Sequence, residues 1–289
     1  MTIASTARQR FRDVLNGNAC VHPGSVFDPV SARIAEDLGF EVGMFAGSIA
    51  SLTVLGAPDA ILLTLTEFAD QARRICRASS LPLMCDADHG YGNALNVMRT
   101  VEELENAGVA GLSIEDTLLP MQFGSPDKTE LVSVAEGTAK VEAALKARQD
   151  EGLVIVGRTS AAAITDADDA ARRLKAYQAA GADALFAVGV RTRADLDVIA
   201  DATDLPLIVG GIGPDMMDRD YLASRKVRLA LQGHQPFAAA VEAIHTTLKA
   251  LRGGTAPSDL ERIASPDLMK QAMRDPGFRD RVRAYLQED

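Results

Sequence analysis

The sequence predicts an α/β protein built as a (β/α)8 TIM barrel with extra helices after the eighth repeat. Short apolar runs alternate with helical patterns through most of the 289 residues. The alternation occurs eight times, which is the number that closes such a barrel. The apolar runs are continuous rather than alternating with polar residues, as strands of a parallel sheet covered on both faces require.

The predicted strands, in chain order, cover residues 24–28, 42–47, 81–88, 110–116, 153–159, 184–190, 205–211 and 227–233. An amphipathic helix is predicted for residues 1–17, and helices between the strands include residues 93–108, 133–152, 166–182 and 193–204. These segments carry apolar residues at three- and four-residue spacing, and several stop at a glycine suited to a left-handed cap. An open doubly wound sheet is the alternative, but the segment Val26–Ala32 after the first strand lacks its glycine-rich phosphate loop.

No segment resembles a linker, so residues 1–289 are predicted to form one barrel domain, with 258–289 as a helical carboxyl-terminal extension. Pro266 is placed to begin a helix in that extension. The extension falls outside the eight repeats. It is therefore a candidate to pack on a neighbouring subunit.

Composition narrows the class of partner. The net charge is −10, from 40 acidic and 30 basic residues, and no basic cluster is present, which argues against nucleic acid or an anionic membrane as a partner. The odd set of three cysteines, Cys20, Cys76 and Cys85, suits a reducing compartment. No run has the length of a signal peptide core or of a membrane span, so a cytoplasmic location is expected.

In TIM barrels the chemistry lies at the carboxyl ends of the strands. The polar residues at these ends are Asp28, Ser48, Asp86, Asp88, Glu115, Asp116, Arg158, Thr159, Ser160 and His234. The sixth and seventh strands end in Gly and Val, which leaves open space.

The acidic residues predict a metal site. Asp86 and Asp88 are two residues apart and so point to the same side of their strand, next to Glu115 on the adjacent strand. Oxygen-only ligands favour Mg²⁺, or Mn²⁺, over zinc. The alternative is that these acids cap helices or pair with arginines. His89 faces the other way by the same alternation and is not counted among the ligands.

Three further side chains are candidate substrate ligands. Arg158 would face the metal across the mouth of the barrel, where its planar fork suits a substrate carboxylate, although a buried ion pair with Glu115 or Asp86 is the alternative. Ser48 could bind an anion through its hydroxyl and backbone N–H, or simply cap a helix. His234 opens the last barrel helix, where it could serve function, capping or packing.

The strand ends carry no lysine that could act as the nucleophile of a Schiff-base mechanism. The seven lysines (128, 140, 146, 175, 226, 249 and 270) lie in helices, in the loop after the fourth strand or before the eighth. No lysine is therefore placed for a Schiff base. Cys85 should point away from Asp86 and Asp88, towards the helices.

Four segments carry a resemblance to a known family: residues 25–40, 46–68, 81–124 and 231–237. They resemble the isocitrate lyase/phosphoenolpyruvate mutase superfamily, and most nearly its oxaloacetate decarboxylase branch. The resemblance covers nearly the whole chain in order, and the blocks DADHGYGN and SIEDTLLP are specific. It implies a barrel that holds an α-keto acid or its enolate on Mg²⁺, assembled as a homotetramer whose subunits exchange helices.

Matched by position, the resemblance also implies roles for individual residues. Asp86 corresponds to the direct metal ligand, while Asp59, Asp88 and Glu115 correspond to residues that hold the waters of the metal. Ser48, Arg158 and His234 match substrate-binding positions. Arg158 and His234 are also the predicted catalytic residues.

The sequence departs from relatives at three places. Lyases of the superfamily carry a Lys-Lys-Cys-Gly-His type motif after the fourth strand, whereas Thr117–Leu131 contains no cysteine, which argues against cleavage of isocitrate or methylisocitrate. Ser160 replaces the asparagine of an Arg-Thr-Asn-Ala stretch. Gly210–Gly213 replaces Thr-Tyr-Gly-Asn. The last two changes remove polar groups from the rim.

The resulting functional prediction is Mg²⁺-dependent decarboxylation of oxaloacetate to pyruvate and CO₂ through a metal-stabilised enolate. One alternative is a C–C or P–C bond lyase of the methylisocitrate lyase or phosphonopyruvate hydrolase type, acting on a related α-keto or 2-hydroxy acid. Another is a non-catalytic binder of α-keto acids.

Overall fold

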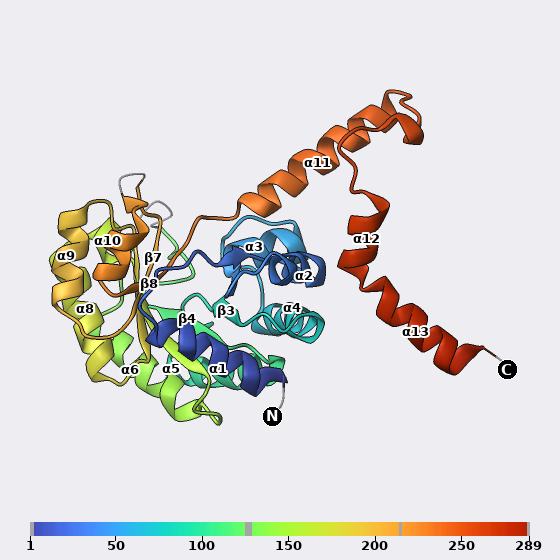
Figure 1. Cartoon of the computed structure of the whole chain (residues 1–289). Coiled ribbons are helices and arrows are strands. Elements are labelled where there is room, and N and C mark those ends of the chain that lie inside the picture. The colour runs from blue at the N-terminus through green and yellow to red at the C-terminus, as the bar shows by residue number, and fades with distance from the viewer. Residues whose placement is uncertain (1–2, 125–128, 214–215, 288–289) are drawn as a thin grey trace. The chain divides into compact units, whose positions relative to one another are not determined.

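The computed structural model describes residues 3–124, 129–213 and 216–287. Its centre is one sheet of eight parallel strands in the order β1 to β8 (Figure 1). The strands are β1 (Gly24–Ser25), β2 (Gly43–Ala46), β3 (Leu83–Asp86), β4 (Gly111–Glu115), β5 (Val154–Thr159), β6 (Ala184–Val188), β7 (Leu207–Gly210) and β8 (Val227–Ala230). All eight lie within the predicted ranges, so the α/β, TIM-barrel-like fold is confirmed.

Helix α1 precedes the first strand, and the other helices alternate with the strands along the chain. They are α1 (Ile3–Asn16), α2 (Pro29–Asp37), α3 (Gly47–Ala50), α4 (Leu65–Ala78), α5 (Ala94–Ala107), α6 (Val134–Ala147), α7 (Ala161–Ile164), α8 (Ala167–Ala179), α9 (Arg193–Asp201) and α10 (Arg219–Ser224). A single π-helical segment, Ser51–Leu55, continues α3. The caps follow the sequence signals: α5 begins after Asn93, whose side chain accepts from the Leu95 N–H, and ends at Gly108 in the left-handed conformation.

The sheet curls so that its last strand reaches the chain just ahead of its first. Val21 forms a parallel bridge with Leu229 of β8. Its N–H donates to the Arg228 carbonyl at 2.9 Å, and its own carbonyl accepts from Ala230 N–H at 3.0 Å. The strand ends are therefore gathered around one mouth, which is what brings distant polar residues together.

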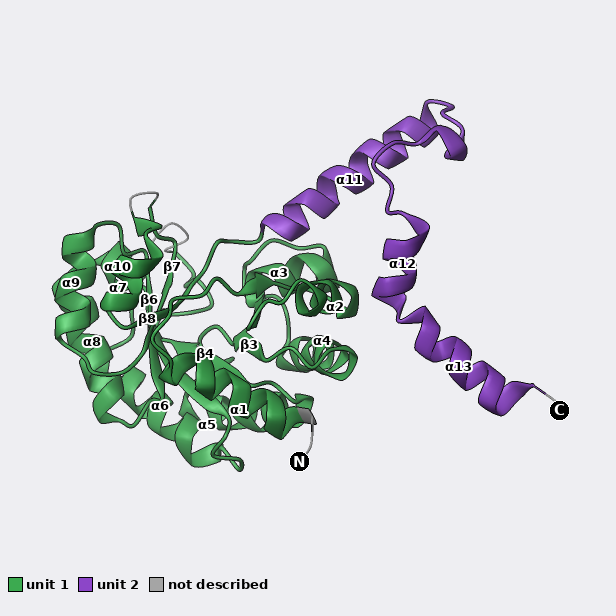
Figure 2. Cartoon of the chain, in the orientation of Figure 1, with its two compact units in different colours: residues 1–234 green, residues 235–289 purple. Residues whose placement is uncertain are grey.

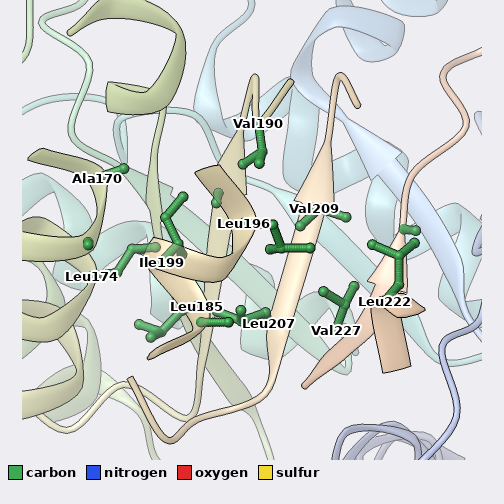
Figure 3. Close-up of a cluster of buried hydrophobic side chains, with 14 of the residues drawn as sticks. Ala170, Leu174, Leu185, Val190, Leu196, Ile199, Leu207, Val209, Leu222 and Val227 are labelled. Atoms are coloured by element: carbon green, nitrogen blue, oxygen red, sulfur yellow. The ribbon is translucent and has the colours of Figure 1, made fainter. Parts of the chain in front are cut away.

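The strands pack on both faces because their side chains alternate. One buried cluster, between the sheet and helices such as α8 and α9, includes Leu174, Leu185, Ile199 and Leu207 (Figure 3). A second cluster lies on the other face of the strands and contains Met44, Met84, Val154, Val156 and Phe186. Residues 185 and 186 of β6 thus belong to opposite faces, as the period of a strand requires.

Helix α1 supplies part of the second cluster. Phe11 is fully buried there, and a Cβ atom on Gly111 would lie 2.5 Å from its ring, so only glycine leaves room for it. Two arginines hold the helix in place: Arg8 donates to Asp150 at 2.6 Å, and Arg12 donates to Asp183 at 3.1 Å. The amphipathic helix predicted at this end of the chain is therefore confirmed.

The chain divides into two compact units, residues 1–234 and 235–289 (Figure 2). The second unit contains α11 (Gln235–Arg252), a short 3-10 turn (Pro257–Asp259), α12 (Pro266–Met273) and α13 (Asp275–Leu286). Pro266 opens α12, as predicted. Whether residues 1–289 act as one domain with an extension from 258 stays a prediction. Among the residues described, no helix is long and apolar enough to cross a membrane.

Candidate active site

A cavity of about 460 Å³ lies at the carboxyl ends of the strands. It is lined by every residue that the sequence predicted for the site: Ser48, Asp59, Asp86, Asp88, Glu115, Arg158 and His234. Apolar side chains, among them Met44, Phe186 and Leu231, complete the wall together with Gly210 and Gly211. This volume and this mixture of a few polar groups in an apolar wall are typical of small-molecule sites.

Three neighbouring strands position the charged centre. Asp86 ends β3, Glu115 ends β4, and Arg158 lies opposite Glu115 in the register of β5. One terminal nitrogen of the Arg158 guanidinium pairs with Asp86, and the other pairs with Glu115 at 2.9 Å. The ion pair that was the alternative for Arg158 is therefore present. Ser113 donates to the remaining oxygen of Asp86 at 3.0 Å, which fixes that carboxylate from a second side.

Arg158 stays charged in this setting. Burial alone would lower the pKa of its guanidinium, but the carboxylates of Asp86 and Glu115 outweigh that effect and raise it. The guanidinium carbon lies 5.3 Å from the centre of the Phe186 ring. Its buried Nε–H has no hydrogen-bond partner in the structure, so this side chain retains an unused donor.

Asp88 is held in an unusual backbone conformation with a φ of 49°. Its carboxylate packs directly against Gly47: a Cβ atom on that glycine would lie 2.4 Å from one carboxylate oxygen and 2.6 Å from the other. Gly47 is thus needed for close approach rather than for a special φ. The second and third strands are coupled at this point through the side chain of Asp88.

The site gathers four carboxyl groups around one arginine. Burial raises the pKa of Asp88 well above its usual range, and the carboxylates of Asp86, Glu115 and Asp59 raise it further. Burial also raises the pKa of Glu115, against the opposing effect of Arg158, and it raises the pKa of Asp59. One arginine faces four carboxylates here, so the cluster favours an additional cation.

The donor set fits a hard divalent cation held by few direct ligands. Among the described residues, no three His, Cys, Asp or Glu side chains converge closely enough to coordinate one ion together. A shell of three or more protein ligands is therefore absent from that part of the chain. Mg²⁺, by contrast, is commonly bound through one or two carboxylates and keeps several of its waters. Oxygen donors with an excess of negative charge match that preference.

His234 follows β8 and sits between two hydroxyl groups. Its Nδ1 lies 2.8 Å from Ser25 Oγ, and its Nε2 lies 3.2 Å from Ser48 Oγ. Burial lowers the pKa of His234, although the carboxylates of Asp86 and Asp59 act in the opposite direction. The imidazole is therefore neutral at neutral pH. Ser48 does not cap α3, because that position is taken by Ala46.

Two acids at strand ends serve the fold instead. Asp28 caps α2 by accepting from Ser31 N–H at 2.7 Å. Asp116 turns away from the cavity and accepts hydrogen bonds from Arg173 at 3.1 Å and from the Tyr177 hydroxyl at 2.6 Å. The alternation along β4 separates Asp116 from Glu115.

The loop after β3 explains why His89 stays outside the cavity. Gly90, Tyr91 and Gly92 all have positive φ, so the chain turns sharply after Asp88. His89 is buried behind the site, and its carbonyl accepts from Lys140 Nζ at 3.0 Å.

No described lysine or cysteine lines the cavity; Lys128 lies outside the described residues. Lys140 nevertheless reaches the back of the strand ends from α6. Sequence reasoning missed this contact, and it also missed Ser25, because both depend on side-chain reach across the fold.

Comparison with known proteins gives a consistent result. The family described as phosphoenolpyruvate phosphomutase matches residues 11–252. A protein named oxaloacetate decarboxylase from Bradyrhizobium sp. (strain BTAi1 / ATCC BAA-1182) is 58% identical over 280 residues, which cover 97% of each chain. A protein of the same name from Rhodopseudomonas palustris (strain BisA53) is 57% identical and covers 96% of each chain.

Solved structures with the same fold are more distant in sequence. Phosphoenolpyruvate phosphomutase from Streptomyces platensis subsp. rosaceus superposes with a TM-score of 0.86 at 28% identity, over 97% of this chain and 99% of that one. A phosphonopyruvate hydrolase in complex with oxalate and Mg²⁺ gives a TM-score of 0.85 at 27% identity, with the same coverage.

Proposed function

The chain belongs to the phosphoenolpyruvate mutase/isocitrate lyase superfamily, and we propose that it is a carboxy-lyase that converts oxaloacetate to pyruvate and CO₂. The observation that carries this proposal is the 58% identity to an oxaloacetate decarboxylase across 97% of both chains. The cavity supports it, since carboxylates, an arginine and a neutral histidine converge there around a space of small-molecule size.

The acids are proposed to hold Mg²⁺, with Mn²⁺ as an alternative. Asp86 would be the direct ligand, and Asp59, Asp88 and Glu115 would hold waters of the ion. A bound divalent cation would act as a Lewis acid for the negative charge that develops on the substrate. The carboxylate-rich donor set supports this assignment, as does the presence of oxalate and Mg²⁺ in the related hydrolase structure.

The remaining polar residues are proposed to bind and orient the substrate. Arg158 offers a permanent positive charge for a substrate carboxylate. His234 and Ser48 offer hydrogen-bond donors for the keto oxygen. When the bond to the departing carboxylate breaks, its electron pair moves towards the keto oxygen, and C3 then takes a proton. Donors aimed at that oxygen stabilise the charge as it forms.

This chemistry needs no covalent nucleophile, which agrees with a cavity that no described lysine or cysteine lines. A P–C or C–C lyase on a related acid is less well supported. The phosphonopyruvate hydrolase and a 2,3-dimethylmalate lyase share only 27% and 25% identity with this chain, against 58% for the decarboxylase.

The decisive test is pyruvate formation from oxaloacetate by the purified protein, with Mg²⁺ and with EDTA. Because free Mg²⁺ and buffer can themselves decarboxylate oxaloacetate, each reaction is matched to one without protein. We expect a strong acceleration that EDTA abolishes. No acceleration over the protein-free rate would overturn the proposal. Tight oxalate binding in the same preparation, with no turnover of any α-keto acid, would identify a binder instead.

We also propose that the chain forms a complete (β/α)8 barrel domain, with 258–289 as its extension, and assembles as a homotetramer whose subunits exchange carboxyl-terminal helices. Helix α11 buries none of its side chains, although Val241, Ile244, Leu248 and Leu251 share one face. The barrel unit in turn exposes apolar side chains that include Leu38, Leu62 and Leu95. The apolar face of α11 would be covered by a second copy of the chain in such an assembly.

Light scattering on a gel-filtration column tests the assembly. The wild-type mass should be four times that of the chain. The double substitution Ile244→Glu and Leu248→Glu should reduce it. Glu242→Gln, on the same helix, is the matched control that should leave it unchanged. A monomeric wild-type protein would refute the assembly without affecting the decarboxylase test.

A further inference from the structure

We propose that Ser25 is a positioning residue that selects the tautomer of His234, so that Nε2 carries the proton and faces Ser48 and the cavity. This inference rests on the proposed function for its kinetic consequences. The hydrogen-bonding pattern itself can be tested without turnover. Ser25 is not among the described residues that line the cavity, and its hydroxyl contacts His234.

The strand geometry explains why a serine at this position can reach His234. In β1, Gly24 faces the outer helices, because a Cβ atom there would lie 3.2 Å from Ala35 Cβ and 3.3 Å from the Phe40 ring. Ser25, the next residue, must point to the opposite side. Its register partner in β2 is Met44, which lines the cavity. Ser25 therefore faces the interior of the barrel, with its hydroxyl 2.8 Å from His234 Nδ1.

A neutral imidazole has one N–H and one acceptor nitrogen. The two hydrogen bonds that join Ser25, His234 and Ser48 can therefore be donated in either of two directions. In the first, Ser25 O–H donates to Nδ1, and Nε2–H donates to Ser48 Oγ. The Ser48 hydroxyl proton then remains free to donate to a ligand. In the second, Ser48 donates to Nε2, and Nδ1–H donates to Ser25. That direction turns only lone pairs towards a ligand.

The ligand decides between the two directions. A substrate with keto and carboxylate oxygens presents acceptors, so the cavity must supply donors. Only the first direction leaves both the His234 Nε2–H and the Ser48 hydroxyl pointing towards the cavity side as donors. It requires a hydroxyl donor at Nδ1, which Ser25 provides. Removing that hydroxyl deprives Nδ1 of its hydrogen-bond partner, and the preference for Nε2–H is lost.

The protein contains an internal reference for the opposite tautomer. His22 Nδ1 lies 2.7 Å from the carbonyl oxygen of Ala230. A carbonyl can only accept, so Nδ1 of His22 must carry a proton. The two histidines should therefore give opposite signatures in one spectrum. No change at Ser25 should affect His22.

The experiment is ¹⁵N NMR of the imidazole nitrogens in the full-length protein labelled at histidine, without substrate. His234→Gln and His22→Gln are used only to assign the signals. In the wild type we expect His234 to be protonated on Nε2 and His22 on Nδ1. In Ser25→Ala the His234 signals should shift towards a mixture of tautomers, while those of His22 stay in place. A wild-type His234 protonated on Nδ1, or unchanged His234 signals in Ser25→Ala, would overturn the proposal.

Kinetics separate positioning from simple structural support. Ser25→Ala should lower kcat by about tenfold to a hundredfold, since His234 loses the hydrogen bond that selects its tautomer. The KM for oxaloacetate and the melting temperature should change little. Ser25→Thr keeps the hydroxyl and should restore both the rate and the tautomer. If Ser25→Thr restored the tautomer but not the rate, the positioning role would be refuted. If the wild type did not decarboxylate oxaloacetate, the proposed function would fail while the NMR result still decided the tautomer.

Discussion

Replacing Gly47 with alanine should displace the carboxylate of Asp88 and weaken the binding of Mg²⁺ while the protein stays folded. The new Cβ atom would lie 2.4 Å from one carboxylate oxygen of Asp88, whereas ordinary contact begins at 3.4 Å. The carboxylate must therefore retreat by about 1 Å. The backbone of Gly47 does not have positive φ, so alanine adds no strain of its own there.

The expected loss follows from that displacement. Groups that support a metal from outside its direct ligands typically contribute tenfold to a hundredfold in metal affinity or activity. A misplacement of about 1 Å near reacting groups can cost roughly a hundredfold in rate. We therefore expect the Mg²⁺ concentration that gives half-maximal rate to rise by about tenfold or more. At saturating Mg²⁺ the rate should recover only in part.

The assay is the initial rate of pyruvate formation across a range of Mg²⁺ concentrations, with thermal unfolding recorded on the same samples. Gly277→Ala is the control, since a Cβ atom there meets nothing within 4 Å. It should leave both the Mg²⁺ dependence and the rate unchanged. A Gly47→Ala protein whose Mg²⁺ dependence stays within about twofold of the wild type would refute a role for Asp88 at the metal.

Three further outcomes are expected. Asp86→Asn should remove nearly all Mg²⁺-dependent pyruvate formation while circular dichroism shows a folded protein; full activity in this variant would place the metal elsewhere. Burial and neighbouring carboxylates raise the pKa of Asp88 in the folded state above its unfolded value, so its contribution to stability is present below the unfolded pKa and is lost as pH rises through the folded one. The melting temperature in EDTA should therefore fall with rising pH. Asp88→Asn should flatten that fall, and a slope equal to that of the wild type would contradict the shift. Phe11→Ala should lower the free energy of unfolding by about 3–5 kcal/mol in urea titrations, with the KM for oxaloacetate unchanged; a cost below about 1 kcal/mol would show that the inner cluster does not depend on α1.

The fold could be predicted because its signals are local and repeated. Each strand is a continuous apolar run, and strand alternation then decides which residues face inward. The same alternation placed Asp86, Glu115 and Arg158 in one cavity and turned Cys85 and Asp116 away from it. These three members of the cavity could therefore be identified from strand alternation, whereas Asp59, in the loop before α4, was indicated only by the family resemblance.

The partners within the site could not be predicted in the same way. An ion pair of Arg158 with Asp86 or Glu115 was one of two alternatives left open by the sequence, but its pairing with both acids at once depends on the stagger of three strands, which no local pattern encodes. Ser25 lies before the end of the first apolar run and is separated from His234 by most of the chain. The curl of the sheet brings them together, so only the assembled structure reveals the contact.

The way α1 is anchored has a consequence for how the chain folds as it is made. Asp150, the partner of Arg8, follows it by 142 residues in the sequence, and Asp183, the partner of Arg12, follows it by 171 residues. At a synthesis rate of about 5–20 residues per second, Arg12 must wait on the order of ten to thirty seconds for that partner. Throughout this interval Phe11 has no barrel interior to enter. Helix α1 is thus placed only after much of the barrel that follows it has been made, and its apolar face stays uncovered until then.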